Sequence, residues 1–226
     1  MPAWGTARAT DEIPGLGRLE QLMLRTDGLT TTSMEVLIGA RIDVEVVEHW
    51  ILPLHADVHA MSASDPDYTG IIPPEVAAGV DRSLVVLDAR PEETLLMREI
   101  LHRGDDGARY GAAAVAVVLD RLPTAVARVL AGSDEPIGRA LRAAGVMIER
   151  ELLTWGLEPA GDRAHRLTGS VEPWQPVPAR EYVMRLSDQG VALGLFSEWF
   201  APCLFAPSPT VSRRRRRRDH GQQAAR

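Results

Sequence analysis

The sequence predicts an α+β fold: one mainly antiparallel sheet of about six strands, with helices packed beside it. Segments of alternating or β-branched residues occur as hairpins closed by short polar turns, a pattern typical of antiparallel strands. The order of the segments is helix, helix, strand, hairpin, helices, strand, hairpin. This order lacks the regular strand–helix alternation of a parallel doubly wound sheet, so we do not expect a parallel sheet.

The N-terminal half is predicted to begin with two short helices. Residues 16–24 have helical spacing of apolar side chains and end at a turn over residues 26–28, and a second helix over residues 31–38 is ended by a glycine. Residues 41–51 alternate and are rich in β-branched side chains, which indicates a strand. The next stretch, residues 52–74, is rich in Pro, Asp, Ser and Gly. Connections of this length in a compact domain are often lids.

The C-terminal half is predicted to contain two hairpins. The first turns at the sequence Gly-Asp-Asp-Gly and the second at Ser-Asp-Gln-Gly. Between them lie two helices, one of which has a proline suited to its first turn, then a strand and a Pro/Gly-rich connector. In order, these segments are the strands 93–103 and 109–119, the helices 123–130 and 137–144, the strand 146–155, the connector 158–177, and the strands 181–186 and 191–200.

Length and charge indicate one acidic folded domain followed by a basic tail. A single domain over residues 16–205 is expected, preceded by a flexible lead-in, residues 1–15, and followed by a disordered arginine-rich tail, residues 206–226. The net charge is −6, and all 25 basic residues are arginines. The seven arginines and one aspartate of residues 213–226 leave 18 basic and 30 acidic residues, a net charge of −12, on the rest of the chain. A domain this acidic is not expected to bind nucleic acid, and the tail is most simply a solvated end.

Other sequence features exclude several classes of protein. The single cysteine, Cys203, rules out an intramolecular disulfide framework. No apolar stretch is long enough to span a membrane, and the N-terminus lacks the apolar region of a secretory signal, so we expect a cytoplasmic protein. A glycine-rich phosphate loop is also lacking, because the Gly-Leu-Gly near the N-terminus follows no strand. His55 and His59 have the i, i+4 spacing of metal ligands, but their Pro-rich context speaks against a helix. His102, near a hairpin turn, is expected to be solvated.

Arg98 is the first candidate for a site residue. It lies in an alternating strand and shares one face with Leu96, Ile100 and His102. An arginine in this setting lies along solvent or in a structural salt bridge, or it is buried and offers a planar fork that suits a carboxylate. The pattern alone favours a structural role and leaves the binding role open.

Glu198 is the second candidate. It shares one face of the last strand with Gly194, Phe196 and Phe200. A carboxylate among aromatic rings is costly unless it is paired or protonated, so its pKa could be raised, as a proton donor requires. The alternative is a glutamate at a strand end in water, and the spacing alone favours that alternative.

Five segments in order resemble the chorismate pyruvate-lyase family, enzymes that split chorismate into 4-hydroxybenzoate and pyruvate. They span almost everything between residues 16 and 205. The segments are LEQLMLRTDGLTTTSMEVLIGARIDVEVV (19–47), LLMREILHRG (95–104), VLDRLPTAV (118–126), DEPIGRALRAAG (134–145) and LGLFSEWFAP (193–202).

The resemblance implies a fold, an activity and a set of site residues. It implies a single antiparallel sheet with a ligand buried beneath flaps, and a lyase reaction on chorismate without metal or organic cofactor. Arg98 and Glu198 match the family's two essential charged positions: Arg98 would hold a carboxylate and Glu198 would handle protons. Leu29 matches a ligand contact. The candidates for the apolar walls or their immediate support are Leu29, Ile100, Phe196 and Trp199.

Ala114 is where the chain departs from the family. Relatives carry an arginine or a glutamate at the substrate-binding position that we align with Ala114. A methyl group there loses a charge-assisted contact, which slows turnover or abolishes it. Three alternatives follow: a slow chorismate lyase, a related enzyme for another chorismate-like substrate, or a non-catalytic aromatic-acid-binding module such as the sensing domains of some transcription regulators.

Overall fold

The computed structural model describes residues 14–26, 29–54 and 74–206 of the chain. Several predictions lie outside the described residues. They are most of the lead-in, the turn at Asp27 and Gly28, most of the proposed lid over residues 52–74 with its His55 and His59, and the arginine-rich tail from residue 207.

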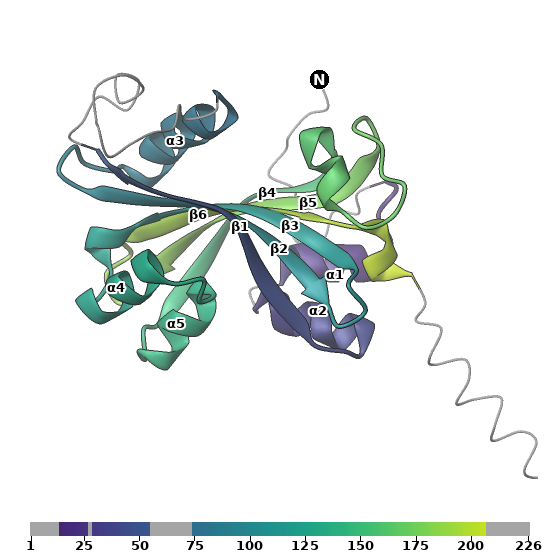
Figure 1. The fold of residues 1–226 in the computed structure, drawn as a ribbon, viewed down its shortest axis with the longest axis horizontal. Helices are drawn as coiled ribbons and strands as arrows, with labels where there is room; N and C mark the ends of the chain where they lie inside the picture. Colours follow the sequence, from purple (N-terminus) through teal and green to yellow (C-terminus); the bar gives the residue numbers. More distant parts are fainter. Residues whose placement is uncertain (1–13, 27–28, 55–73, 207–226) are drawn as a thin grey trace, which may run out of the picture.

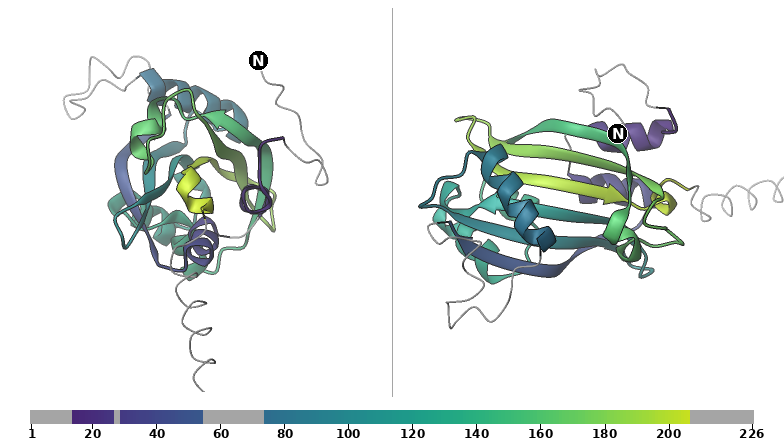
Figure 2. Two further views of the ribbon diagram at one scale, coloured as in Figure 1. Left: turned by 90° about the vertical axis from the view of Figure 1, so that its right-hand side faces the viewer. Right: turned by 90° about the horizontal axis from the view of Figure 1, so that it is seen from above.

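The described residues form a six-stranded sheet in the order β1-β2-β3-β6-β5-β4, and every neighbouring pair of strands is antiparallel. The predicted fold class is thereby confirmed. Figure 2 shows that the sheet is strongly twisted and curved. The strands are β1 (Ile42–Pro53), β2 (Thr94–Gly104), β3 (Arg109–Val118), β4 (Ile148–Pro159), β5 (Pro176–Leu186) and β6 (Ala192–Phe200).

The helices cover both faces of this sheet. Figure 1 shows α1, α2, α4 and α5 below the sheet, and α3 together with the segment that joins β4 to β5 above it. The α-helices are α1 (Arg18–Arg25), α2 (Thr30–Ile38), α3 (Pro74–Leu87), α4 (Thr124–Gly132) and α5 (Ile137–Ala143). Three short 3-10 helices complete the described part: η1 (Leu119–Arg121), η2 (Gly161–Arg166) and η3 (Pro202–Phe205).

Alternation along the strands divides the core between the two faces. Leu96, Val115 and Val117 face α4 and α5, where they pack with Leu130 and Leu141 in one buried cluster. The neighbouring positions face α3 and pack in a second cluster, which contains Leu95, Met97, Ala116, Val118 and Leu195. Because adjacent strand residues point to opposite faces, two neighbouring positions of one strand can serve two different sites.

The helix α3 was missed by the sequence analysis, which treated residues 52–74 as a connection and left the segment after it unassigned. The helix begins at Pro74, a residue favoured in a first helical turn because its missing N–H has no partner there in any case. Val80, Leu84 and Leu87 recur at i, i+4 and i+7 and pack on the sheet in the second cluster. The connector 158–177 likewise contains η2, which was not predicted.

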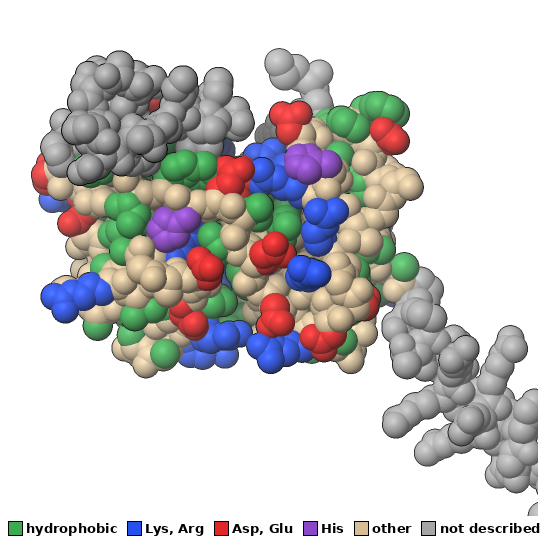
Figure 3. Space-filling view, viewed as in Figure 1, with side chains coloured by type: hydrophobic (Ala, Val, Ile, Leu, Met, Phe, Trp, Pro, Cys, Tyr) green, Lys and Arg blue, Asp and Glu red, His purple; other side chains and the backbone are tan. Residues whose placement is uncertain are grey.

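Two further observations concern membrane-spanning helices and the charge of the surface. Among the described residues, no helix is long and apolar enough to cross a membrane. On the face shown in Figure 3, acidic and basic side chains are interspersed rather than gathered in a patch of one sign.

Candidate ligand-binding site

A cavity of about 220 Å³ lies on the lower face of the sheet, where α2 and α5 contribute to its lining. Leu29, Arg98 and Glu198, three of the four predicted substrate-binding residues, all line it. Ile100 and Phe196, two of the predicted apolar walls, line it as well. The segments 19–47, 95–104, 134–145 and 193–202 therefore converge on one site.

Arg98 is buried in this cavity with 2% of its surface exposed, but its hydrogen bonds go to the protein itself. Its Nη1 donates to the carbonyl oxygen of Glu135 at 3.0 Å, and its Nη2 donates to the carbonyl oxygens of Leu130 and Ser133. These carbonyls lie at the end of α4 and before α5, where backbone acceptors lack helical partners. Burial lowers the pKa of Arg98, and its Nε has no hydrogen bond to any described residue.

Glu198 is equally buried, with 4% of its surface exposed, and is held by three donors. Arg180 Nε donates to its Oε2 at 2.7 Å, and Thr30 Oγ1 and Tyr182 Oη donate to its Oε1 at 2.8 and 3.2 Å. Burial alone would raise the pKa of Glu198, but the charge of Arg180 and the hydrogen bond from Thr30 lower it. The prediction of a raised pKa is therefore wrong: Glu198 is a carboxylate, because an unforeseen arginine is paired with it.

Arg180 also joins the helices to the sheet. Its Nη1 donates to the carbonyl oxygens of Met23 and Thr26, at 2.8 and 3.0 Å, near the end of α1. Its Nη2 donates to Thr30 Oγ1, at the start of α2, at 2.8 Å. Arg98 and Arg180 thus have parallel roles, because each is a buried strand arginine that holds one helix pair over the cavity. Arg98 and Glu198 line the same cavity, but each bonds to different partners.

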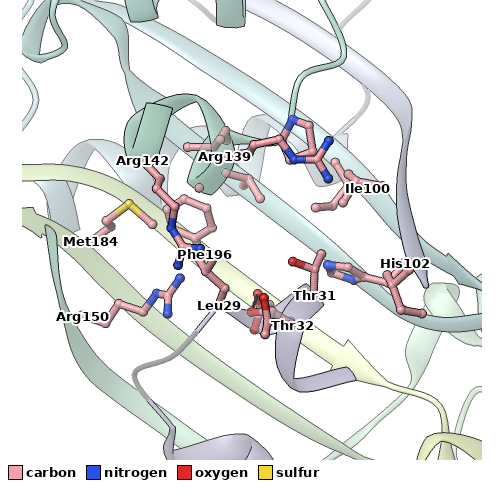
Figure 4. Close-up of a pocket in the computed structure, with 18 of the residues that line it drawn as sticks. Leu29, Thr31, Thr32, Ile100, His102, Arg139, Arg142, Arg150, Met184 and Phe196 are labelled. Atoms are coloured by element: carbon pink, nitrogen blue, oxygen red, sulfur yellow. Dashed lines mark hydrogen bonds between the residues drawn. The ribbon is translucent and has the colours of Figure 1, made fainter. Parts of the chain in front are cut away.

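Further cations surround the opening of the cavity. Arg139 and Arg142 come from α5, and Arg150 comes from β4, where its guanidinium lies 5.3 Å from the ring centroid of Tyr182. Figure 4 shows Arg142 and Arg150 extending toward one another. These three arginines were missed by the sequence analysis, because helix and strand positions far apart in the chain meet only in the fold.

The N-terminus of α2 adds partial positive charge to the site. Thr30, Thr31 and Thr32 form its first turn and line the cavity. Leu29, the residue that precedes the helix, provides no side-chain cap. The backbone N–H groups of a first turn have no acceptor within the helix and carry the positive end of its dipole. This helix end therefore favours an anion in the cavity.

His102 differs from its prediction. It was expected to be solvated, but it is 3% exposed and lines the cavity, because β2 continues past it to Gly104 and α2 covers it. Burial lowers its pKa, so the ring is neutral near pH 7. Its Nδ1 has no hydrogen bond within the described part of the chain.

Ala114 and Trp199 lie on the opposite face of the sheet. Ala114 stands opposite Glu99 on β2 and Ser197 on β6, and its neighbour Val115 takes the position that faces the cavity. Trp199 points away as well, and its Nε1 donates to Glu158 Oε2 at 2.9 Å. The structure thus does not bring the fourth predicted substrate-binding residue, or the fourth predicted wall residue, to this site.

Among the residues that the structure describes, the remaining candidates do not form a second reactive centre. Cys203 is partly buried, and its Sγ lies 3.7 Å from the carbonyl oxygen of Thr168. No group of three potential metal ligands occurs among the described residues.

The comparisons with known proteins concern the fold. No family model and no curated protein matches the sequence. Among solved structures, the chain is similar to PhnF from Mycobacterium smegmatis, with 17% identity and a TM-score of 0.51 over 80% of this chain and 67% of that chain. It also matches the effector domain of PhnF from the same organism (18% identity, TM-score 0.49, 78% and 90% covered) and a GntR-family transcriptional regulator from Enterococcus faecalis (12%, 0.44, 73% and 97%). At 17% identity, the likeness to PhnF shows a shared fold.

Proposed function

We propose that this chain is a binding module for a small organic anion with an apolar or aromatic body. The observation that carries the proposal is the charge of the cavity. Four arginines line it against two glutamates. Glu198 is already neutralised by Arg180, and Arg139 is paired with Glu135, so positive charge is still in excess. The surplus positive charge and the N-terminus of α2 favour an anion.

The rest of the lining fits the body of such a ligand. Leu29, Ile100, Val115, Ile137 and Phe196 supply apolar contacts. A cavity with mostly apolar walls and a few polar groups is typical of small-molecule sites. The buried Nε of Arg98 and Nδ1 of His102, which lack partners among the described residues, are groups to which a ligand could bind. The fold shared with PhnF is compatible with such a role.

Isothermal titration calorimetry with 4-hydroxybenzoate and its neutral amide tests the proposal. We expect the carboxylate to bind at least about tenfold more tightly than the amide, because a charge-assisted contact is lost in the amide. Arg142→Gln should remove most of that preference. Arg128→Gln is the matched control, because Arg128 lies exposed on α4 outside the cavity. Equal affinity of the wild-type chain for the two compounds, or no binding of either, would contradict the proposal.

Chorismate lyase activity is the second candidate. The observation in its favour is that Leu29, Arg98 and Glu198, which match the family's positions, line one cavity. The Nε of Arg98 is the donor without a partner among the described residues, so for Arg98 to hold a substrate carboxylate with two donors, it would have to exchange a bond to a backbone carbonyl for a bond to the ligand. Glu198, as a carboxylate, would accept a proton rather than donate one. Incubation with chorismate, followed by measurement of 4-hydroxybenzoate and pyruvate, tests this candidate, with Arg98→Ala as the inactive control. Binding of chorismate without either product would rule it out.

A further inference from the structure

A second cavity lies on the opposite face of the sheet and is larger than the first, about 530 Å³. It is bounded by α3 and by η2, the two segments above the sheet in Figure 1. Its floor comes from strand positions that alternate with those of the first cavity, such as Glu99 beside Arg98 and Ser197 beside Glu198. Arg98 and Val115 line both cavities, but the binding function proposed above does not involve Glu99 or Ser197.

One row of residues across the sheet explains why this face is hollow. Glu48, Glu99, Ala114, Ser197 and Glu181 stand directly opposite one another on the successive strands β1, β2, β3, β6 and β5. The two central residues, Ala114 and Ser197, have small side chains and leave space above them. The outer three residues are carboxylates that surround this space.

The carboxylates on one side exceed their cations. Glu48 and Glu99 are directly opposite on paired strands, an arrangement of like charges that is destabilising by itself. A single guanidinium, that of Arg166 on η2, pairs with both of them: Nη2 lies 3.1 Å from Glu48 Oε1, and Nη1 contacts Glu99. One negative charge is left over. Glu181, on the other side, is paired with Arg82 and accepts a hydrogen bond from Ser197.

Arg163, also on η2, is a cation whose hydrogen-bond donors are not used. Its guanidinium lies 3.7 Å from the ring centroid of Trp199. No hydrogen bond or ion pair joins it to the other residues that the structure describes. Burial lowers its pKa, and the nearby charges of Glu158 and Asp162 offset part of that effect. A guanidinium stacked on a ring still presents its N–H donors at its edge, where they suit a carboxylate.

Apolar surface completes the lining, which includes Trp50, Met97 and Leu195. Glu99 on β2 and Trp199 on β6 are separated by one strand, β3. Two strand spacings amount to about 10 Å across the sheet, and Trp199 stands opposite Ala112, two residues or about 7 Å along β3 from the Ala114 that faces Glu99. The long side chains of Glu99 and Arg163 narrow this separation. The surplus carboxylate and the unused guanidinium therefore lie on opposite sides of one partly apolar space.

We propose that this second cavity binds a small zwitterion of the amino-acid class with an apolar or aromatic body. Its ammonium group lies at Glu48 and Glu99, its carboxylate at the edge of Arg163, and its body against Trp50 and Met97. A cation alone would leave Arg163 without an acceptor, and an anion alone would leave the surplus carboxylate without a cation.

Three probes with one shared body test the proposal: phenylalanine, phenethylamine, which lacks the carboxylate, and 3-phenylpropionate, which lacks the ammonium. They are titrated calorimetrically into the full chain carrying Arg142→Gln, a substitution that weakens the binding of aromatic carboxylates at the first cavity. We expect phenylalanine to bind about tenfold more tightly than either single ion, because each lacks one charge-assisted contact. The inference is overturned if the three probes bind equally or if phenylalanine does not bind.

Variants then assign the two charges separately. Glu99→Gln should weaken the binding of phenylalanine and phenethylamine about tenfold and leave the affinity for 3-phenylpropionate unchanged. Arg163→Gln should weaken the binding of phenylalanine and 3-phenylpropionate about tenfold and leave the affinity for phenethylamine unchanged. Ala114→Leu, which fills the floor without changing any charge, should abolish binding of all three. Glu151→Gln, an exposed glutamate of β4 outside both cavities, is the control. Phenylalanine affinity that persists in both charge variants would overturn the inference.

Two further measurements separate effects on the second cavity from loss of folding and from effects on the first cavity. If Glu99→Gln does not fold, as judged by circular dichroism, Glu48→Gln replaces it, because the Glu48 side chain is 35% exposed and tolerates the change better. Each variant made without Arg142→Gln is also titrated with 4-hydroxybenzoate, whose affinity should stay unchanged. Failure of the first cavity to bind 4-hydroxybenzoate would contradict the proposed function alone, and failure of phenylalanine to bind would contradict the second cavity alone.

Discussion

Arg180 and Glu198 stand opposite each other on β5 and β6 and form an ion pair of 2.7 Å between Nε and Oε2, with only 3% and 4% of their surfaces exposed. The remaining donors of Arg180 bind the end of α1 and the start of α2. A charge pair removed from water in this way is retained only when nearly all its hydrogen bonds are made. The pair therefore links the position of the α1–α2 helices to the strands below them.

Replacing Glu198 with glutamine should strongly destabilise the fold. The variant leaves the charge of Arg180 buried without its carboxylate, and loss of one partner of a buried pair costs about 3–5 kcal/mol. The free energy of unfolding, measured by urea denaturation, checks this value. Glu151→Gln is the control, because Glu151 pairs with Arg185 at the surface, where such a pair contributes less than about 1 kcal/mol. Similar losses in the two variants would contradict the buried-pair interpretation.

Arg98→Met should loosen the α4–α5 pair. The variant fits the same apolar surroundings but leaves the carbonyl oxygens of Leu130, Ser133 and Glu135 without their donor. Unsatisfied buried acceptors cost about 1–3 kcal/mol each, so amide hydrogen exchange should increase in α4 and α5 more than in α1 and α2. Arg98→Lys should not restore protection, because a single ammonium cannot reach three carbonyls as the planar fork does. Unchanged exchange in α4 and α5 would exclude this role for Arg98.

His102 predicts a pH dependence of stability. Its pKa is lowered by burial from an ordinary value of 6.5, so below pH 6.5 the unfolded chain takes up a proton that the folded chain does not. The contribution of His102 is therefore fully present above pH 6.5 and is lost as the pH falls toward its lowered folded-state pKa, by at most about 1.4 kcal/mol per pH unit.

His102→Gln should flatten the decline of the unfolding free energy below pH 6.5. His165→Gln is the matched control, because His165 is exposed on η2. His49, whose pKa is also lowered by burial, leaves a residual slope in the His102 variant. Identical slopes in the wild-type chain and the His102 variant would show that His102 is not titrated differently by folding.

The sheet and four of the five α-helices could be predicted from the sequence because their signals are local. Alternation, β-branched residues and turn sequences identified β1, β2, β3 and β6 almost to their ends, and the faces assigned to Arg98 and Glu198 agree with the structure. The helix α3 was missed because the Pro-rich stretch before it was treated as the dominant feature.

The partners of the site residues depend on register, which is not local. The hairpin around residues 187–190 places Arg180 opposite Glu198 through a register shift between Met184 and Arg185. Regular pairing outward from the turn would place Arg180 opposite Ser197, so the turn sequence alone does not predict the pair. The predicted strand began at residue 181, five positions after the start of β5 at Pro176, so Arg180 was never considered. His102 was misjudged for a related reason, because its burial depends on α2, a helix far away in sequence. Ala114 was expected beside the charged pair, but the alternation of β3 places it on the other face.

Two glycines, one in the sheet and one at the end of α4, differ in how tightly their surroundings are packed. A Cβ added at Gly194 on β6 would lie 2.7 Å from the carbonyl oxygen of Ala116 and 2.9 Å from Val117 Cγ2, and the first of these is backbone that cannot move aside. Gly194→Ala should therefore lower the unfolding free energy by about 1–3 kcal/mol. At Gly132, the last residue of α4, an added Cβ meets nothing within 4 Å. Gly132→Ala should raise the unfolding free energy by up to about 1 kcal/mol, because alanine loses less backbone freedom in a helix. Urea denaturation of the two variants side by side checks both signs, and a loss of stability at Gly132 or none at Gly194 would contradict this packing.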